Sequence, residues 1–217
     1  MSFPDIQKWP ADKDFVAFGA SLNTDFVISA YRKGIFPWPD PEYPEVIWAS
    51  PKDRGILELD FFHLGKSDRR HLRKIPFHVT FNEAFEKVIL ECAQIKRPEQ
   101  HGTWITEGML SAYTELHKKG FAHSVEAWLN GELVGGLYGV CVDKIFSAES
   151  MFHKTDYASK AALNFLVARL KQLDFKFLDV QVVTPVMNHM GARLIPRSKF
   201  LTLLKLHRVE NFQLSLK

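Results

Sequence analysis

Two segments of the chain carry apolar residues at the spacing of one helix face, residues 26–32 and 107–119. Asn23 stands just before the first segment and Thr106 just before the second, while Gly34 follows the first. A side-chain oxygen at the start of a helix and a glycine after its end satisfy backbone groups that lack partners within the helix. The sequence therefore predicts two short helices with defined ends.

From residue 77 onward, strand-like and helix-like patterns alternate. Asn82 is expected to cap the helix that follows it, and Asn130-Gly131 is typical of a tight hairpin turn. This order predicts an α+β fold with a mixed sheet. The expected strands cover residues 55–59, 78–81, 122–129, 133–142, 144–147 and 177–183, and the further helices cover residues 84–92 and 158–173.

The N-terminal quarter of the chain has a different character, because it is rich in aromatic residues and prolines. Residues 34–41 contain three prolines, each of which lacks a backbone donor and fixes φ, so we expect an ordered loop there. The pattern changes after Pro51. We therefore expect a small N-terminal domain over residues 1–53 and a larger domain over residues 54–217.

The composition narrows the class of protein. Of the 217 residues, 46% are hydrophobic and 24% are charged, as is usual for a globular protein with a sizeable core. Neither a membrane span nor a secretion signal is recognisable, so a cytoplasmic location without membrane attachment is expected. Cys92 and Cys141 are isolated and are expected to be buried thiols rather than disulfide or zinc ligands. The net charge of +3 permits an RNA partner without requiring one.

Polar residues inside an apolar strand are the first candidates for chemistry. Asp179 and Gln181 lie two residues apart in the predicted strand 177–183, where a buried charge is costly unless it is paired or used. Glu149 lies at the expected end of another strand, a common place for a binding site. The alternatives are that Asp179 pairs with a buried arginine or caps a loop, and that Glu149 is simply solvated.

Aromatic and basic residues suggest contacts with nucleic acid. Trp38 and Trp104 lie in loop-like sequence, where indole rings can stack on bases, although most tryptophans serve only in packing. Residues 66–74 hold five basic side chains whose spacing suits a phosphate backbone, although a solvated surface would look the same. These side chains are Lys66, Arg69, Arg70, Arg73 and Lys74. The histidines show no metal-ligand spacing, so no metal site is expected.

Taken in order along residues 16 to 204, these segments resemble the bacterial leucyl/phenylalanyl-tRNA-protein transferase family. The resemblance is carried by residues 30–38, 48–51, 102–106, 123–126, 133–139, 149–152, 158–160 and 179–181. It implies a small N-terminal domain followed by a GNAT-like, that is acetyltransferase-like, domain. It also implies that Leu or Phe is moved from leucyl-tRNA or phenylalanyl-tRNA to proteins with N-terminal Lys or Arg, which tags them for degradation.

The resemblance also implies roles for individual residues. Asp179 with Gln181 would orient the acceptor amine and help to deprotonate it, and Glu149 would attract the basic acceptor side chain. A route in which the terminal ribose hydroxyl relays the proton stays open. No cofactor is expected, because the aminoacyl ester is already activated, and a monomer is expected. Stacking on the terminal adenosine would fall to Tyr31, Trp38 and Trp104, and an apolar aminoacyl pocket to Leu137, Phe146, Met151 and Leu178.

Three other interpretations compete with this one. An acyl-CoA N-acetyltransferase would need close-approach glycines around its pyrophosphate, and residues 148–162 contain no glycine. A non-catalytic RNA-binding module would leave Asp179 and Gln181 without a purpose. A member of the same family with a changed amino acid or acceptor preference would keep all these residues.

Overall fold

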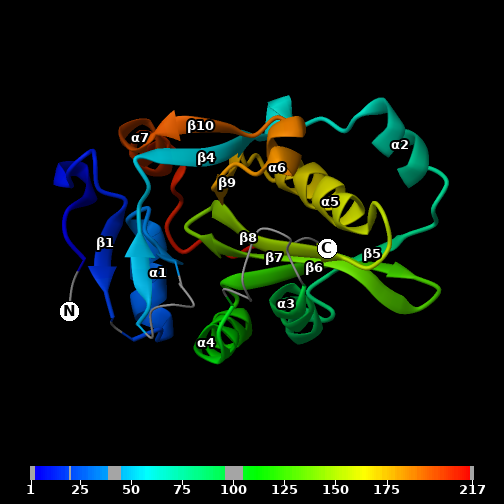
Figure 1. Cartoon of the computed structure of the whole chain (residues 1–217), viewed down its shortest axis with the longest axis horizontal. Coiled ribbons are helices and arrows are strands. Elements are labelled where there is room, and N and C mark those ends of the chain that lie inside the picture. Colours follow the sequence, from blue (N-terminus) through cyan, green and yellow to red (C-terminus); the bar gives the residue numbers. More distant parts are fainter. Residues whose placement is uncertain (1–2, 20, 39–44, 96–104, 216–217) are drawn as a thin grey trace.

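The chain folds into two β-sheets that are flanked by helices (Figure 1). The computed structural model describes residues 3–19, 21–38, 45–95 and 105–215. A small antiparallel sheet near the N-terminus has the strand order β1-β3-β2. Its strands are β1 (Phe15–Phe18), β2 (Phe36–Trp38) and β3 (Ile47–Ala49).

The larger sheet has seven strands in the order β10-β4-β9-β8-β7-β6-β5. Neighbouring strands are antiparallel except β8 and β9, which are parallel, so the sheet is mixed. The predicted α+β class is therefore confirmed. The strands are β4 (Asp53–Glu58), β5 (His78–Phe81), β6 (Ala122–Leu129), β7 (Glu132–Val142), β8 (Ile145–His153), β9 (Phe177–Gln181) and β10 (Arg193–Pro196).

Helices cover both faces of the larger sheet. In Figure 1, α5 crosses one face of the strands β6, β7 and β8, while α3 and α4 lie against the opposite face. None of the described helices has the length and apolar character that crossing a bilayer requires. The helices are α1 (Thr24–Arg32), α2 (Lys66–Leu72), α3 (Phe85–Gln94), α4 (Glu107–Lys118), α5 (Ala158–Gln172), α6 (Pro185–His189) and α7 (Arg197–His207), with single turns at Ile6–Lys8 and Leu59–Phe61.

The alternation of side chains along β7 divides the core into two layers. Tyr138 and Val140 pack with α3, α4 and the N-terminal sheet, whereas Leu137 and Cys141 face α5. The first layer also contains Trp48 of β3, so one apolar cluster joins the N-terminal sheet to the larger one. The division into domains over residues 1–53 and 54–217 stays a prediction. Cys92 and Cys141 are both buried thiols and form no disulfide among the described residues, as expected.

Two of the three predicted helix caps are confirmed. The side chain of Asn23 accepts a hydrogen bond from the backbone N–H of Phe26 at 2.9 Å, and Thr106 caps α4. The prediction for Asn82 was wrong, because α3 begins only at Phe85. Asn82 takes a left-handed conformation with φ 61°, and the carboxylate of Glu126 accepts the hydrogen bond from Ala84 at the start of the helix instead.

Two predicted boundaries near the site also differ from the structure. Within residues 34–41, the segment Phe36–Trp38 pairs with β3 as an edge strand, where a proline is tolerated, rather than forming a loop throughout. The strand expected at residues 144–147 continues to His153. Glu149 therefore lies within β8 and not at its end.

Arg197, at the start of α7, connects this helix to the N-terminal part of the chain. Its side chain is almost fully buried, and its guanidinium donates hydrogen bonds to the backbone carbonyls of Pro10, Lys13 and Pro51. A planar group with five donors suits several carbonyls at once. The N-terminal segment is thus held by a residue that lies about 185 positions later in the sequence.

Candidate active site

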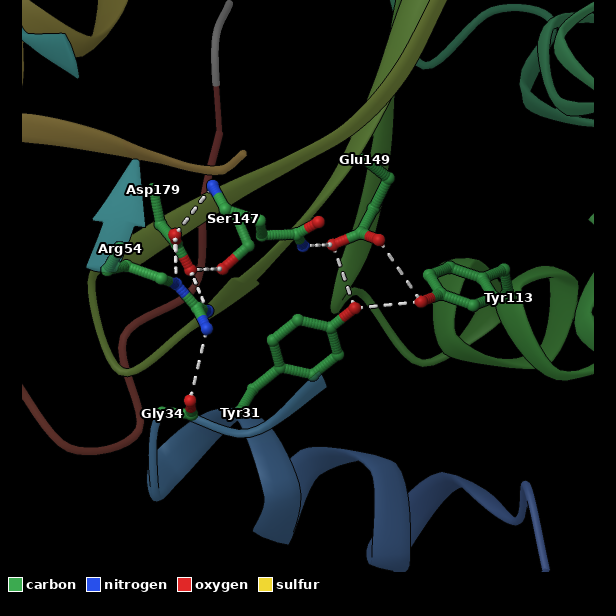
Figure 2. Close-up of polar contacts among 8 residues, drawn as sticks. Tyr31, Gly34, Arg54, Tyr113, Ser147, Glu149 and Asp179 are labelled. Atoms are coloured by element: carbon green, nitrogen blue, oxygen red, sulfur yellow. Dashed lines mark hydrogen bonds and ion pairs between the residues drawn. The ribbon is translucent and has the colours of Figure 1, made fainter. Parts of the chain in front are cut away.

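The candidate site lies where β8 and β9 separate. The two strands pair in parallel only at Phe146 with Leu178 and at Ser147 with Asp179, and beyond these pairs they diverge. Polar side chains from both strands meet at this fork (Figure 2). No pairing between β8 and β9 continues past these two positions, so side chains of the two strands can meet there.

A β-bulge in β8 presents Glu149 at the fork. On β7, Gly139 pairs with Ala148 and Tyr138 pairs with Ser150, so Glu149 is the additional residue of the bulge. Bulges commonly redirect a side chain next to an active site. A Cβ atom at Gly139 would collide with the ring of Phe146 and with the carbonyl of Ser147, so the bulge requires a glycine opposite it.

A second irregularity shapes the end of β9. On β4, Gly55 pairs with Gln181 and Ile56 pairs with Asp179, so Val180 is left without a partner in the register. Gln181 has φ 59°, a left-handed conformation that costs a residue with a Cβ about 1 kcal/mol or more. Asp179 and Gln181 therefore do not simply share one face of a regular strand, as their spacing had suggested.

Asp179 is fully engaged by its neighbours. Its carboxylate oxygens accept hydrogen bonds from Nε and Nη2 of Arg54 at 2.7 and 2.6 Å. The hydroxyl of Ser147 donates to it at 3.0 Å and the backbone N–H of Gln181 at 3.1 Å. The side chains of Asp179 and Arg54 are both almost completely buried. This carboxylate is thus a compensated, buried charge, in accord with the alternative that Asp179 pairs with a buried arginine.

Glu149 has a different environment. Among the described residues its hydrogen-bond partners are neutral: Tyr31 at 2.8 Å, the side-chain amide of Gln181 at 2.7 Å and Tyr113 at 3.3 Å. The side chain is partly exposed at the fork. Burial raises the pKa of Glu149 to about 7, and the negative charge of Asp179 adds to the effect, while the hydrogen bonds from Tyr31 and Gln181 and the charge of Arg54 oppose it.

Two tyrosines from different helices complete the site. The hydroxyls of Tyr31 on α1 and Tyr113 on α4 lie 2.8 Å apart, and both contact Glu149 (Figure 2). Burial, followed by the nearby charge of Glu149, raises the pKa of both phenols well above the ordinary value, so both remain protonated donors. Sequence reasoning missed Tyr113 and Arg54. The acid within an apolar strand was the only available signal for a buried arginine.

The residues expected to stack on an adenosine are placed unequally. Trp38 is 38% exposed at the end of β2 and contacts the ring of Phe36, with centroids 5.9 Å apart. Tyr31 is only 6% exposed, and its hydroxyl points to Glu149. Trp104 lies outside the described residues. A stacking role for any of these three residues stays a prediction.

The four residues expected to form the aminoacyl pocket belong to one apolar cluster. Leu137, Phe146 and Leu178 are buried on the α5 side of the sheet, and Met151 packs against them while remaining partly exposed. Phe146 and Leu178 are register partners next to the fork. The structure thus brings these residues together beside Glu149 and Gln181, and their role as a pocket is not tested by it.

The basic residues of the 66–74 segment lie on and just after α2, and all are exposed. Asp68, on the buried side of the helix, forms an ion pair with Lys160 of α5 at 2.7 Å. His71 stacks on Tyr157 with ring centroids 4.5 Å apart. These two contacts dock α2 on the start of α5, so its cations point to solvent. The described residues contain no cluster of three or more His, Cys, Asp or Glu side chains suited to a metal ion.

Comparison with known proteins identifies the family. A family model described as "Leucyl/phenylalanyl-tRNA protein transferase" matches residues 56–205, and the model of its N-terminal domain matches residues 20–52. The leucyl/phenylalanyl-tRNA–protein transferase of Lawsonia intracellularis is 46% identical, over 93% of this chain and 88% of that protein. The transferase of Pseudoalteromonas translucida is 44% identical, over 98% of this chain and 88% of that protein.

Acetyltransferase-like folds occur among the structural neighbours. One is the ribosomal-protein-alanine N-acetyltransferase of Brucella melitensis, which is 15% identical, covers 44% of this chain and 73% of its own, and has a TM-score of 0.31. That likeness is too low to carry an argument. The family matches and the high identity over nearly the whole length do carry one: the chain belongs to the leucyl/phenylalanyl-tRNA protein transferase family.

Proposed function

We propose that this aminoacyltransferase moves Leu or Phe from a charged tRNA to the α-amine of proteins that begin with Lys or Arg, so that the new N-terminus marks them for degradation. The observation that carries the proposal is the environment of Glu149, a half-buried residue whose carboxylate is held by three neutral donors at the fork. A carboxylate whose hydrogen-bond partners are all neutral is suited to take its counter-ion from a ligand.

The transfer step needs little from the protein beyond orientation. The neutral α-amine of the acceptor attacks the carbonyl carbon of the aminoacyl ester and an amide bond forms. The ester C–O bond breaks, and the terminal ribose oxygen of the tRNA leaves with the proton that the amine gives up. Hydrogen-bond donors aimed at the carbonyl oxygen would stabilise the negative charge that develops on it.

The two acids of the site are assigned different tasks in this proposal. Asp179 has both oxygens engaged by Arg54, Ser147 and Gln181, which favours a positioning role over that of a proton acceptor. Gln181, whose side-chain amide nitrogen donates a hydrogen bond to Glu149, would orient the α-amine of the acceptor. Glu149 would bind the ammonium or guanidinium of the first acceptor residue. Relay of the proton through the ribose hydroxyl fits this division, since it requires only positioning.

The donor tRNA is assigned to surfaces on either side of the fork. Trp38, with Trp104, would stack on the terminal adenosine, while the burial of Tyr31 favours a role in holding Glu149 over stacking. The aminoacyl side chain would enter beside Met151, the partly exposed member of the apolar cluster formed with Leu137, Phe146 and Leu178. An apolar pocket separates side chains that differ by one methylene by only about 1–3 kcal/mol, in accord with dual specificity.

The exposed cations on and after α2 would contact tRNA phosphates. These cations are Lys66, Arg69, Arg70, Arg73 and Lys74. A monomer in the cytoplasm, where charged tRNA is available, completes the proposal. The division into an N-terminal domain over residues 1–53 and a catalytic domain over residues 54–217 is also proposed, and it agrees with the limits of the two family matches.

Transfer can be tested with radiolabelled Leu, Phe and Arg on their cognate tRNAs and with two model proteins that differ only in an N-terminal Lys or Asp. We expect label from Leu and Phe on the Lys protein alone. Label from Arg on the Asp protein would keep the reaction type but overturn the specificity. Absence of any label would overturn the proposed function.

A further inference from the structure

Arg54 is the most completely enclosed charged side chain near the site. It projects from β4 and is 1% exposed. Its guanidinium contacts two aromatic rings, with Cζ 4.4 Å from the ring centroid of Phe36 and 4.6 Å from that of Phe200. Phe36 belongs to β2 and Phe200 to α7, so three separate elements meet at this one cation. Two cation–π contacts restrict the position of the guanidinium.

The edge of the same guanidinium is also occupied. Nε and Nη2 donate to the two oxygens of Asp179, and Nη1 donates to the backbone carbonyl of Gly34 at 3.2 Å (Figure 2). A buried ion pair is commonly no more stabilising than well-packed apolar residues of the same volume. Stability alone therefore gives no reason for a charged pair here, whereas a need for fixed geometry does.

The geometry that the pair fixes is that of Gln181. The Asp179 oxygen that accepts from Arg54 Nε also accepts from the backbone N–H of Gln181 at 3.1 Å. This hydrogen bond supports the left-handed conformation of Gln181, which is unfavourable on its own. The side-chain amide of Gln181 then reaches Glu149 at 2.7 Å. A continuous series of contacts thus leads from Arg54 to the acceptor side of the fork.

The other side of Arg54 contacts the segment that carries Trp38. Arg54 bonds to Gly34 and stacks on Phe36, and the ring of Phe36 in turn contacts Trp38. We propose that Arg54 is a positioning residue for aminoacyl transfer. It orients Gln181 through Asp179, and it holds the acceptor side of the fork, formed by Gln181 and Glu149, in a fixed position relative to the segment that bears Trp38. The inference rests on the proposed function, because it concerns the placement of the two substrates.

The variant Arg54→Lys tests the proposal. Lysine keeps the positive charge beside Asp179 but lacks the planar fork and the stacking faces, so the change is not conservative at this position. We expect kcat/KM to fall at least about tenfold, because KM for the acceptor rises and kcat falls. The Kd for phenylalanyl-tRNA should change less than about threefold. The matched control is Arg197→Lys, at another buried arginine, whose guanidinium donates hydrogen bonds to the backbone carbonyls of Pro10, Lys13 and Pro51. That variant should lower Tm without lowering kcat/KM.

A double-mutant cycle separates positioning from general destabilisation. If Arg54 acts through Gln181, Arg54→Lys should lower kcat/KM by less than about threefold in a Gln181→Ala background. A loss of the same size in both backgrounds would overturn the proposal. So would a loss of activity no larger than that caused by Arg197→Lys.

A milder change keeps the test available if Arg54→Lys does not fold. Phe200→Leu removes one of the two aromatic contacts of Arg54 and substitutes no residue to which Arg54 is hydrogen-bonded. We expect a several-fold loss of kcat/KM that disappears in the Gln181→Ala background, and a loss that persists there would contradict the proposal. If the unmodified protein transfers no amino acid, it is the proposed function that fails.

Discussion

The two acids of the site, Asp179 and Glu149, have the same kinds of oxygen atoms but opposite electrostatic surroundings. Asp179 is buried, faces a guanidinium and accepts hydrogen bonds from three residues. Glu149 also accepts from three residues, yet all three are neutral and the side chain is partly exposed. The number of hydrogen-bonding residues therefore does not distinguish the two acids. The difference is that a guanidinium is hydrogen-bonded to Asp179 and none to Glu149 among the described residues.

The largest effect in this comparison is expected from Asp179→Ala. The change leaves the Arg54 guanidinium buried without its partner, which costs about 3–5 kcal/mol in the free energy of unfolding. Transfer should be almost abolished because Gln181 loses its support. Urea unfolding and a transfer assay would measure both effects, with Asp60→Ala, at an exposed acid, as the control. Unchanged stability would contradict the view that Asp179 is a compensated structural charge.

A second, smaller effect is expected from Glu149→Gln. The amide keeps the size of the side chain but cannot neutralise a cation, so kcat/KM for an acceptor with N-terminal Lys should fall about 10- to 100-fold, as for loss of a charged hydrogen bond worth about 1.5–3 kcal/mol. The free energy of unfolding at pH 8 should not fall, since an ionised carboxylate is removed from a site that raises its pKa. A loss of stability like that of Asp179→Ala would erase the contrast between the two acids.

The pH dependence of kcat/KM tests the contrast between the two acids without a mutation. With a pKa of about 7, Glu149 ionises only as the pH rises through 7, so kcat/KM for a basic acceptor should increase about tenfold per pH unit below that value. Because the folded value lies above the ordinary 4.5, this group's contribution to stability is lost as the pH rises from 4.5 to 7. The α-amine of the acceptor titrates near pH 8, so it gives the profile of kcat/KM against pH a second rise there. The Glu149→Gln variant should keep the rise near pH 8 and lose the rise near pH 7.

The smallest effect concerns charges that lie outside the site. Arg70→Ala and Arg73→Ala should each weaken tRNA binding several-fold and lower the slope of log K against log salt by about 1. Lys205→Ala is the matched control, because this exposed lysine lies on α7 at the opposite end of the molecule from α2 (Figure 1). An unchanged slope in the α2 variants would assign those arginines to an ordinary solvated surface.

Much of the fold could be predicted because the responsible signals are local. Capping side chains at Asn23 and Thr106, the Asn130-Gly131 turn and the apolar periodicities lie within a few residues of the elements that they define. The prediction for Asn82 was wrong because local signals alone were used, whereas the actual capping group, Glu126, comes from the distant strand β6. A cap supplied from 42 residues away leaves no local pattern.

The site could be predicted only in part, because its geometry depends on non-local pairing. The chemistry of Asp179, Gln181 and Glu149 stood out in the sequence as polar residues in or next to apolar segments. The two bulges that present Glu149 and Gln181 depend on the register with β7 and β4, and no spacing within one strand encodes them. The contribution of Tyr113 was equally hidden, since a tyrosine on the apolar face of α4 looks like any other core residue.

The hydrogen bonds of Arg197 to Pro10, Lys13 and Pro51 also bear on the order of events during biosynthesis. The ribosome synthesises residues 10–14 early, yet Arg197, which fastens them, emerges about 185 residues later. Contacts so distant in sequence form late because a long loop must close first. Until α7 has left the exit tunnel, residues 10–14 therefore lack this anchor, and a nascent chain stalled before residue 197 should expose them to proteases that the finished enzyme resists.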